Sequence, residues 1–184
     1  MKKILVFLGS PRKNGNTEKL AKAFAEGARE NGAEVDFFRL SEKSIKPCVD
    51  CRKCWETGKP CVIEDDMKEA YKAIDDAEVL VFCSPVYWYA WSAQIKPLWD
   101  RLLPYCSDKA PKTLKNKGCV LIAAAGDVTR DVFNGMDFAL EKSAGLLGMR
   151  ILGGVRASGV YGPDDVENTG WPAQVRELGK DCAK

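Results

Sequence analysis

The sequence predicts an α/β fold, a doubly wound three-layer sandwich with a five-stranded parallel sheet of strand order 2-1-3-4-5. Segments of strand length alternate with segments of helical periodicity along the 184 residues, which is typical of a parallel sheet with helices on both faces. Five strands favour that order over the six-stranded alternative. No repeat, low-complexity linker or break in composition divides the chain, so we expect one domain over residues 1–184.

The predicted strands are apolar segments bounded by turn residues. Residues 2–8 read KKILVFL, a continuous apolar run that ends before Gly9. Such a run suits a strand that is covered on both faces. The same reasoning predicts the later strands over residues 33–40, 78–84, 117–126 and 150–158.

The predicted helices carry apolar residues at helical spacing. Leu20, Phe24 and Ala28 repeat in this way within residues 17–31. Acidic residues at the start of residues 65–77 favour a helix there, because they complement the positive end of the helix dipole. Further helices are expected within residues 94–105, over residues 131–149 and from Pro163 onward.

Composition excludes several classes of function. The formal net charge of +2 gives no reason to expect nucleic acid or an anionic membrane as a partner. The apolar run Ile4 to Leu8 is too short for a signal peptide, and no other run approaches the length of a membrane span. We therefore expect a cytoplasmic protein, and in a reducing compartment its eight cysteines favour metal or redox use over disulfides. The chain has no histidine, which excludes Ser-His-Asp and Cys-His nucleophiles and histidine zinc sites.

The loop after the first strand, GSPRKNGNT, has the composition of a phosphate site. It matches neither the dinucleotide-binding glycine motif nor the P-loop. It leads directly into a helix N-terminus, whose free N–H groups favour an anion. The alternative is a polar turn in which Asn16 or Thr17 caps the helix, although capping does not explain the polar cluster before it. The candidate phosphate-binding residues are Ser10, Arg12, Asn14, Asn16 and Thr17.

Four aromatic residues crowd the loop after the third strand: Tyr87, Trp88, Tyr89 and Trp91. In the predicted strand order this loop neighbours the first one at the carboxyl edge of the sheet, where such folds bind ligands. A planar conjugated ligand is a natural partner for these rings. The alternative is that they cover the core or a subunit interface. A phosphate site after the first strand and a planar-ring site after the third strand together indicate that the ligand is FMN.

The loop after the fourth strand, residues 123–131, lies close enough to reach the same ring. Gly126 and Asp127 are the candidate contacts in this loop. Helix N-capping is the alternative role of Asp127.

A cysteine-rich loop at residues 46–64 follows the second strand. Its spacing is C-x₂-C-x₂-C-x₆-C, formed by Cys48, Cys51, Cys54 and Cys61. Four cysteine ligands suit a [4Fe–4S] cluster, and three thiols at consecutive short gaps are typical of cluster-binding runs. A structural zinc ion also takes four cysteines, although zinc sites typically pair two C-x₂-C knuckles across a longer spacer. Free thiols without metal are the third alternative.

Three segments carry a resemblance to a known family: GSPRKNGNT, PCVDCRKCWETGKPCVIEDDM and SPVYWYAWSAQIKPLWDR. They are similar to the NADPH-dependent FMN reductase superfamily, and more narrowly to its iron–sulfur flavoprotein branch, over about the first two-thirds of the chain. The resemblance implies a flavodoxin-like fold, bound FMN, a cluster motif with a variable last gap, and a homodimer or homotetramer with flavin near the subunit contacts. It implies phosphate contacts at Ser10, Arg12, Asn16 and Thr17 and ring contacts at Pro85, Val86, Tyr87 and Trp88.

The leading hypothesis for function is an FMN-dependent oxidoreductase or electron-transfer flavoprotein with a [4Fe–4S] cluster on the cysteine loop. A redox donor such as a ferredoxin or NAD(P)H would supply electrons, and a small molecule or a protein would accept them. No catalytic acid or base is assigned, because the flavin carries the chemistry. The alternatives are an NAD(P)H-dependent reductase of FMN or quinones without a cluster, and a non-catalytic flavin- or zinc-binding protein.

Overall fold

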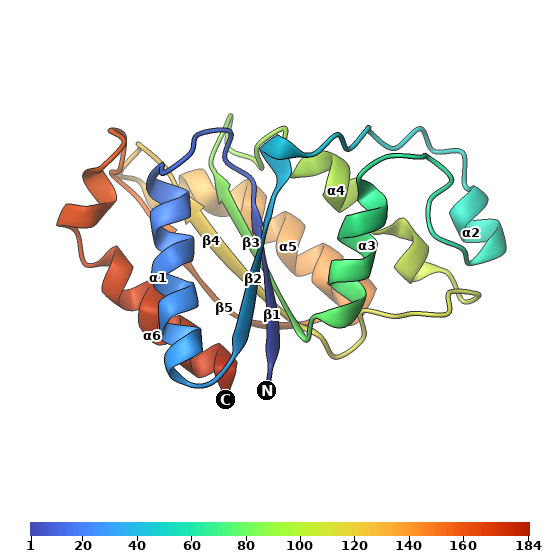
Figure 1. Ribbon diagram of the computed structural model, residues 1–184. Helices are drawn as coiled ribbons and strands as arrows, with labels where there is room; N and C mark the ends of the chain where they lie inside the picture. The colour runs from blue at the N-terminus through green and yellow to red at the C-terminus, as the bar shows by residue number, and fades with distance from the viewer.

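The computed structural model describes all 184 residues and contains one five-stranded parallel sheet (Figure 1). The strand order β2-β1-β3-β4-β5 is the predicted one, and every neighbouring pair is parallel. The predicted fold class is therefore confirmed, and each strand begins and ends within two residues of its predicted bounds. The strands are β1 (Lys3–Leu8), β2 (Glu34–Arg39), β3 (Val79–Pro85), β4 (Gly118–Ala124) and β5 (Arg150–Ala157).

Helices cover both faces of the sheet, as Figure 1 shows. On one face lie α1 (Asn16–Glu30) and α6 (Trp171–Ala183), and on the other lie α3 (Met67–Asp76), α4 (Lys96–Asp100) and α5 (Asn134–Leu147). None of the helices combines the length and the apolar character that crossing a membrane requires.

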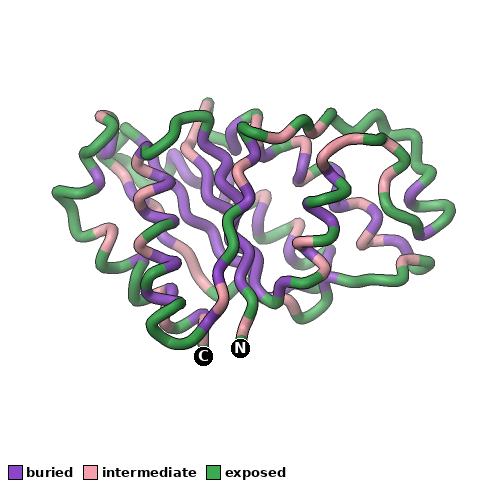
Figure 2. Tube along the Cα trace, in the orientation of Figure 1, coloured by how far each residue is buried: buried purple, intermediate pink, exposed green.

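The core has two halves because side chains along a strand alternate between the faces of a sheet. In β1, Ile4 and Val6 pack with α1 and α6, while Leu5 and Phe7 pack with the helices of the other face. Figure 2 shows the central strands buried and the loops at both edges exposed. The continuous apolar run at the N-terminus therefore forms a strand that is covered on both faces.

The helix expected within residues 94–105 is present but short: α4 ends at Asp100, and a 3₁₀ turn (Leu103–Cys106) follows. The start predicted for the last helix was wrong, because the helix begins not near Pro163 but at Trp171. Pro172 lies in its first turn, where no N–H is needed. The cysteine loop contains a short helix, α2 (Lys53–Thr57), that sequence analysis did not predict.

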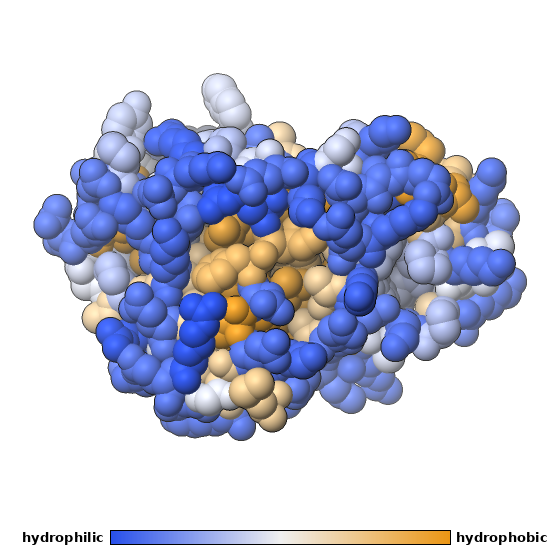
Figure 3. Space-filling view, viewed as in Figure 1, coloured by the Kyte–Doolittle hydropathy of each residue, from blue (hydrophilic) through white to orange (hydrophobic).

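The edge strand β2 borders an apolar strip on the surface, which Figure 3 shows between two hydrophilic helical regions. A cavity of about 270 Å³ lies there, and Ile4 and Leu5 of β1 and Ala73 of α3 are among its lining residues. Phe37 of β2 is partly covered by Arg29, whose guanidinium carbon lies 5.8 Å from the ring centroid. The cavity beside β2 is separate from the candidate site, which lies at the carboxyl ends of the strands.

Candidate functional site

A cleft of about 490 Å³ opens at the carboxyl edge of the sheet. That volume is in the range of small-molecule and cofactor sites. The loops after β1, β3, β4 and β5 all contribute to its lining, so residues from four parts of the chain meet there. Eight of the predicted cofactor-binding residues lie in the lining: Ser10, Arg12, Asn16, Thr17, Pro85, Val86, Tyr87 and Gly126.

The loop after β1 is held against the loop after β3 by buried hydrogen bonds. The Ser92 hydroxyl donates to the carbonyl of Gly9 at 2.5 Å, and the Gly9 amide donates to the carbonyl of Cys83 at 2.7 Å. A side chain at Gly9 would place its Cβ 3.0 Å from that carbonyl, so the close approach requires glycine. Two loops that are 83 residues apart in sequence are thereby fixed side by side.

The N-terminus of α1 faces into this cleft. Ser10 is buried, and its hydroxyl oxygen accepts a hydrogen bond from the Arg12 amide at 3.1 Å. Gly15, Asn16 and Thr17 line the cleft, and the first amides of a helix have no carbonyl partner within it. Free amides, a hydroxyl and a guanidinium are the groups that a phosphate accepts bonds from.

Asn14 does not line the cleft, although the sequence placed it among the candidate phosphate contacts. Its backbone has a left-handed φ of 56°, and its amide donates to Glu18 Oε2 at 2.7 Å. Arg39 Nη2 lies 2.7 Å from Glu18 Oε1. Burial alone would raise the pKa of Glu18, but the bonds from Arg39, Asn14 and Lys22 hold it below its usual value. The carboxylate of Glu18 thus holds the backbone of the loop after β1 at Asn14.

Asn16 is not the cap of α1, and neither is Thr17. The helix begins at Asn16 after an extended Gly15, and no side chain caps it. The Asn16 amide group instead donates to the carbonyls of Val160 at 3.2 Å and Gly162 at 2.7 Å, and its oxygen accepts from the Val166 amide. Because these partners lie about 145 residues away in sequence, local sequence patterns could not reveal them.

The loop after β5 completes the cleft, and sequence analysis missed its contribution. The strand topology could have predicted this contribution, since a parallel sheet brings the loop after every strand to the same edge. A side chain at Gly126 would place its Cβ 2.7 Å from the Tyr161 ring, so Gly126 allows the two loops to meet. The lining residues that were not predicted are Gly15, Ala124, Val160, Tyr161, Gly162 and Pro163.

The four aromatic residues after β3 separate into different environments. Only Tyr87 lines the cleft. Trp88 and Tyr89 are 94% and 64% exposed, with left-handed φ values of 51° and 61°, at the tip of a turn. Trp91 is buried and stacks on Trp99, with ring centroids 5.0 Å apart. The core alternative therefore holds for Trp91, while contact of Trp88 with a ring ligand stays a prediction.

Asp127 lies outside the cleft lining and does not cap a helix. Its Oδ1 accepts hydrogen bonds from the amide and the hydroxyl of Thr129, both at 2.9 Å. These bonds lower the pKa of Asp127. Thr129, and not Asp127, occupies the position before the following 3₁₀ turn.

The cysteine loop extends to the side of the molecule that lies beyond α3, away from the loop after β5 (Figure 1). Cys48 and Cys51 are exposed, Cys54 is buried and Cys61 is half-buried. Burial raises the pKa of the Cys54 thiol, and the charges of Cys61, Cys48 and Cys51 raise it further, so the four thiols are electrostatic neighbours. No three His, Cys, Asp or Glu side chains in the structure are grouped closely enough to hold a metal ion.

The short helix α2 is attached to the segment after α4. The Ser107 hydroxyl donates to the carbonyl of Trp55 at 2.8 Å, and Lys109 Nζ donates to the carbonyl of Glu56 at 2.8 Å. Gly58 ends the helix with a left-handed φ of 68° and approaches the Lys109 carbonyl so closely that a Cβ would lie 2.1 Å from it. The buried Cys54 belongs to this docked part of the loop.

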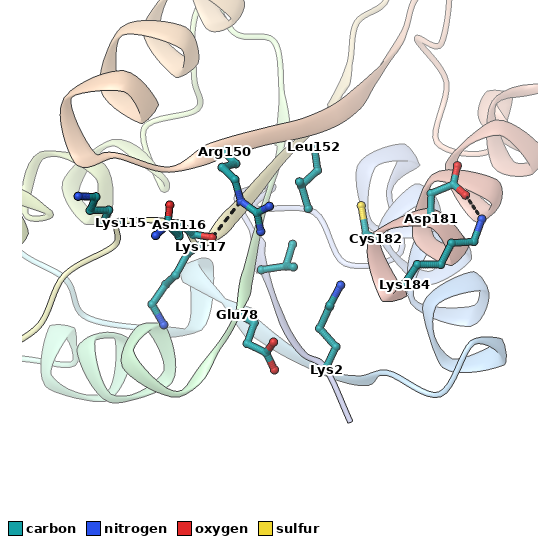
Figure 4. Close-up of a pocket in the computed structure, with 11 residues that line it drawn as sticks. Lys2, Glu78, Lys115, Asn116, Lys117, Arg150, Leu152, Asp181, Cys182 and Lys184 are labelled. Carbon is teal, nitrogen blue, oxygen red and sulfur yellow. Dashed lines mark hydrogen bonds and ion pairs between the residues drawn. The ribbon is translucent and has the colours of Figure 1, made fainter.

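A larger cavity of about 660 Å³ lies at the opposite, amino edge of the sheet (Figure 4). Several of its charged side chains have partners within the protein: Lys117 Nζ donates to the carbonyl of Asp75 at 2.9 Å, and Arg150 Nε to that of Asn116 at 3.2 Å. Lys184 pairs with Asp181 at 2.7 Å. None of the predicted site residues lies there.

The residues of the carboxyl-edge cleft fit FMN by their chemistry. Hydroxyl, guanidinium and helix-terminal amide groups lie on its α1 side, and Pro85, Val86 and Tyr87 lie on its β3 side. The cysteine loop fits an iron–sulfur cluster by the type and number of its donors, because thiolates are the ligands of such clusters. The four sulfur atoms are not grouped around one point in this structure.

Curated relatives share sequence with this chain. An iron–sulfur flavoprotein of Methanocaldococcus jannaschii is 38% identical over 125 residues, which are 67% of this chain and 63% of the relative. An iron–sulfur flavoprotein of Archaeoglobus fulgidus is 35% identical over 141 residues, or 76% of this chain and 62% of the relative. The chain thus spans less than two thirds of the length of these two relatives.

Solved structures and a family model complete the comparison. The fold is similar to an NAD(P)H:quinone oxidoreductase of Methanothermobacter marburgensis, with a TM-score of 0.70, 22% identity and 98% of each chain covered. It is also similar to an FMN-dependent NADH-azoreductase of Bacillus anthracis, with a TM-score of 0.71, 20% identity and all of each chain covered. The model of the NADPH-dependent FMN reductase family matches residues 2–158. The chain therefore belongs to the NADPH-dependent FMN reductase family.

Proposed function

We propose that this protein is an FMN-dependent oxidoreductase that carries a [4Fe–4S] cluster and works in electron transfer. The observation that carries the proposal is the carboxyl-edge cleft, in which the N-terminus of α1, Ser10 and Arg12 meet Val86 and Tyr87. An anion site and a flat apolar wall in one cleft are the two requirements of a flavin mononucleotide.

The residues of the cleft have separate roles in this proposal. Ser10, Arg12 and Thr17 bind the phosphate, together with the first amides of α1. The Asn16 side chain holds the loop after β5 in place, since its polar atoms already have partners there. Pro85, Val86, Tyr87 and Gly126 border the ring. Bound FMN supplies one-electron and two-electron redox chemistry, while the protein binds and orients it.

Cys48, Cys51, Cys54 and Cys61 are the proposed cluster ligands. The proposal is supported by the number and spacing of the thiols and by the names of the relatives from Methanocaldococcus jannaschii and Archaeoglobus fulgidus. A cluster supplies single electrons at this loop. A ferredoxin or NAD(P)H would be the donor, and a small molecule or a protein the acceptor.

We also propose that the protein acts in the cytoplasm and forms a homodimer or homotetramer. Trp88 is 94% exposed and Tyr89 64% exposed beside the cleft. Large apolar side chains in such a position are typical of interaction sites. A subunit contact that covers this turn would place the proposed FMN site close to an interface.

The decisive experiment is metal and flavin analysis of anaerobically purified protein. We expect one FMN and about four irons per chain, with broad absorbance from the cluster. Cys→Ser variants at positions 48, 51, 54 and 61 should lose iron and keep FMN. Cys182→Ser is the matched control, because Cys182 is buried in α6 and far along the chain from the loop. One zinc per chain, or no metal, would contradict the cluster, and protein without FMN affinity would contradict the whole proposal.

A cluster-free NAD(P)H-dependent reductase is the second candidate. A protein of Bacillus subtilis named as an NAD(P)H-dependent FMN-containing oxidoreductase is 28% identical over 129 residues, which are 68% of this chain and 67% of that protein. Rapid NAD(P)H oxidation by iron-free, FMN-loaded protein would favour this candidate. Turnover that requires iron would favour the cluster-containing protein.

A further inference from the structure

Arg101, which directly follows α4, is a charged side chain at the base of the cysteine loop. It is 1% exposed and is the largest fully buried side chain in the protein. Its Nη1 lies 2.6 Å from Asp65 Oδ2, and the Asp65 side chain is 3% exposed. A buried charge is costly unless it is paired and hydrogen-bonded, so this position serves a purpose that an apolar residue would not.

The guanidinium of Arg101 holds both ends of the cysteine loop. Nη1 also donates to the carbonyl of Lys46 at 3.1 Å, and Nη2 donates to the carbonyl of Ile63 at 3.4 Å. Lys46 precedes Cys48 by two residues, and Ile63 follows Cys61 by two residues. One side chain therefore joins the two points at which the loop leaves and re-enters the fold.

Asp65 and Tyr71 complete this closure. Asp65 Oδ2 accepts a hydrogen bond from the Lys46 amide at 2.8 Å, and Oδ1 accepts one from the Met67 amide at 3.1 Å. The Tyr71 hydroxyl donates to the Arg101 carbonyl at 2.6 Å, which fixes the backbone that carries the guanidinium. The stem of the loop is thus held by these contacts within the protein, while Cys48 and Cys51 are exposed.

Arg101 also brings a permanent positive charge to Cys61. Its Nη2 donates to the carbonyl of Ile63, which follows Cys61 by two residues. Nε of Arg101 is buried and has no hydrogen-bond partner. A donor group and a positive charge near a thiolate ligand stabilise the ligand anion and the added electron of a cluster.

We propose that Arg101 is the positioning residue of the cysteine loop: it closes the loop stem at Lys46 and Ile63 and places a buried positive charge at the end of the loop that carries the proposed ligand Cys61. The second part rests on the proposed cluster function, and the first part does not. Closing the stem removes most of the loop entropy that metal binding would otherwise have to overcome. Asp65 keeps the guanidinium in place.

The first test uses the metal-free, FMN-loaded protein and trypsin, which cleaves after the exposed Arg52 and Lys53. Arg101→Met should increase the rate of cleavage in the loop by about tenfold or more, because the stem opens. FMN affinity should stay within about twofold. Arg156→Met is the matched control, since it breaks the partly buried pair between Arg156 of the edge strand β5 and Asp137 of α5. Equal cleavage rates in the two variants would overturn the closure.

The second test uses protein reconstituted with iron and sulfide. Arg101→Met should retain less than about a third of the wild-type iron, and its remaining cluster should have a lower reduction potential, because a positive charge is lost. Arg101→Lys keeps the charge, so its potential should match the wild type although its loop is cleaved faster. Identical potentials in Arg101→Met and the wild type would overturn the charge effect.

The outcomes separate this inference from the proposed function. If the wild type takes up no iron, the cluster and the charge effect both fail, while the trypsin comparison still decides the closure. If the wild type holds about four irons and Arg101→Met holds as many, the positioning role fails alone. Should Arg101→Met not fold, Asp65→Asn and Arg101→Lys replace it, and wild-type cleavage rates and iron content in both would overturn the inference.

Discussion

The carboxyl-edge cleft is lined by four loops that leave the sheet together, whereas the four cysteines lie on one loop that is held at its ends by Arg101 and Asp65 and in its middle by the docked helix α2. In the cleft, Ser92 and Asn16 join loops that are distant in sequence by hydrogen bonds. In the cysteine loop, Arg101 and Asp65 fix the stem, but no three ligands are gathered. The sheet positions the loops of the cleft, whereas side chains at the stem position the cysteine loop.

The difference concerns when each site acquires its shape. A cleft between loops that are fixed to a sheet exists before its ligand arrives, so binding costs little ordering. If the cysteine loop binds a cluster, as proposed, its thiols have to be brought together around the metal, which would couple metal affinity to local folding. We therefore expect FMN binding to be insensitive to changes in the cysteine loop, and iron binding to be sensitive to changes at the loop stem.

The largest expected effect is on the stability of the loop stem. Asp65→Asn should lower the free energy of unfolding of metal-free protein by about 3–5 kcal/mol at neutral pH, because it leaves Arg101 buried without a counter-charge. Urea unfolding followed by circular dichroism measures this cost. A change of less than about 1 kcal/mol would mean that the stem does not depend on the ion pair.

The same variant has a defined pH dependence. Burial alone would raise the pKa of Asp65, but Arg101 and the Lys46 and Met67 amides hold it below its ordinary value of 3.8. The carboxylate therefore contributes its full stability above about pH 3.8 and loses it as the pH falls through the lowered pKa. The stability difference between wild type and Asp65→Asn should be constant at neutral pH and shrink below pH 3.8. A difference that shrinks above pH 5 would contradict this assignment.

A smaller effect is expected in the cleft. Arg12→Met should weaken FMN binding by about 10- to 100-fold, since a hydrogen bond to a charged group contributes roughly 1.5–3 kcal/mol. Fluorescence titration with FMN measures the change, and iron content should not move. Lys13→Met is the control, because Lys13 pairs with Glu42 at 2.6 Å and does not line the cleft. Equal losses in the two variants would show a general charge effect and not a phosphate contact.

Asn16→Ala tests the connection between α1 and the loop after β5. Losing its three bonds should cost about 1–2 kcal/mol and should loosen the loop that contains Tyr161 and Gly162. Faster hydrogen exchange at the Val166 amide, which Asn16 accepts from, would report this directly. Asn16→Asp keeps the acceptor for Val166 and loses the donors, so exchange at Val166 should stay slow in that variant. Fast exchange in both would contradict the proposed role of the acceptor.

The smallest effect is expected at the docked end of the cysteine loop. Lys109→Ala removes an exposed bond to the Glu56 carbonyl and should change stability by about 0.5 kcal/mol or less. Trypsin cleavage after Lys53 should rise only slightly. Lys112→Ala is the matched control in the same segment. A large rise in cleavage would show that this contact, and not the stem, holds α2 in place.

Sequence patterns predicted the sheet and most of the cleft because both depend on local periodicity. Apolar runs of strand length located all five strands, and the strand order then indicated that loops after β1, β3 and β4 share one edge. The loop after β5 obeys the same rule, but its sequence has no phosphate-like or aromatic cluster to draw attention. Asn16 appeared as a cap because caps are judged from neighbouring residues, and its real partners are about 145 residues away.

The sequence alone determined the fold class, the loop that carries four cysteines and the polar loop before α1, because spacing and alternation are properties of neighbouring residues. Only the tertiary structure decided that Trp91 enters the core while Trp88 stays exposed. It also decided that Arg101, 36 residues from Asp65 and 55 from Lys46, closes the cysteine loop. Contacts of this kind arise when elements pack, so they follow from the arrangement of the whole chain and not from any one segment.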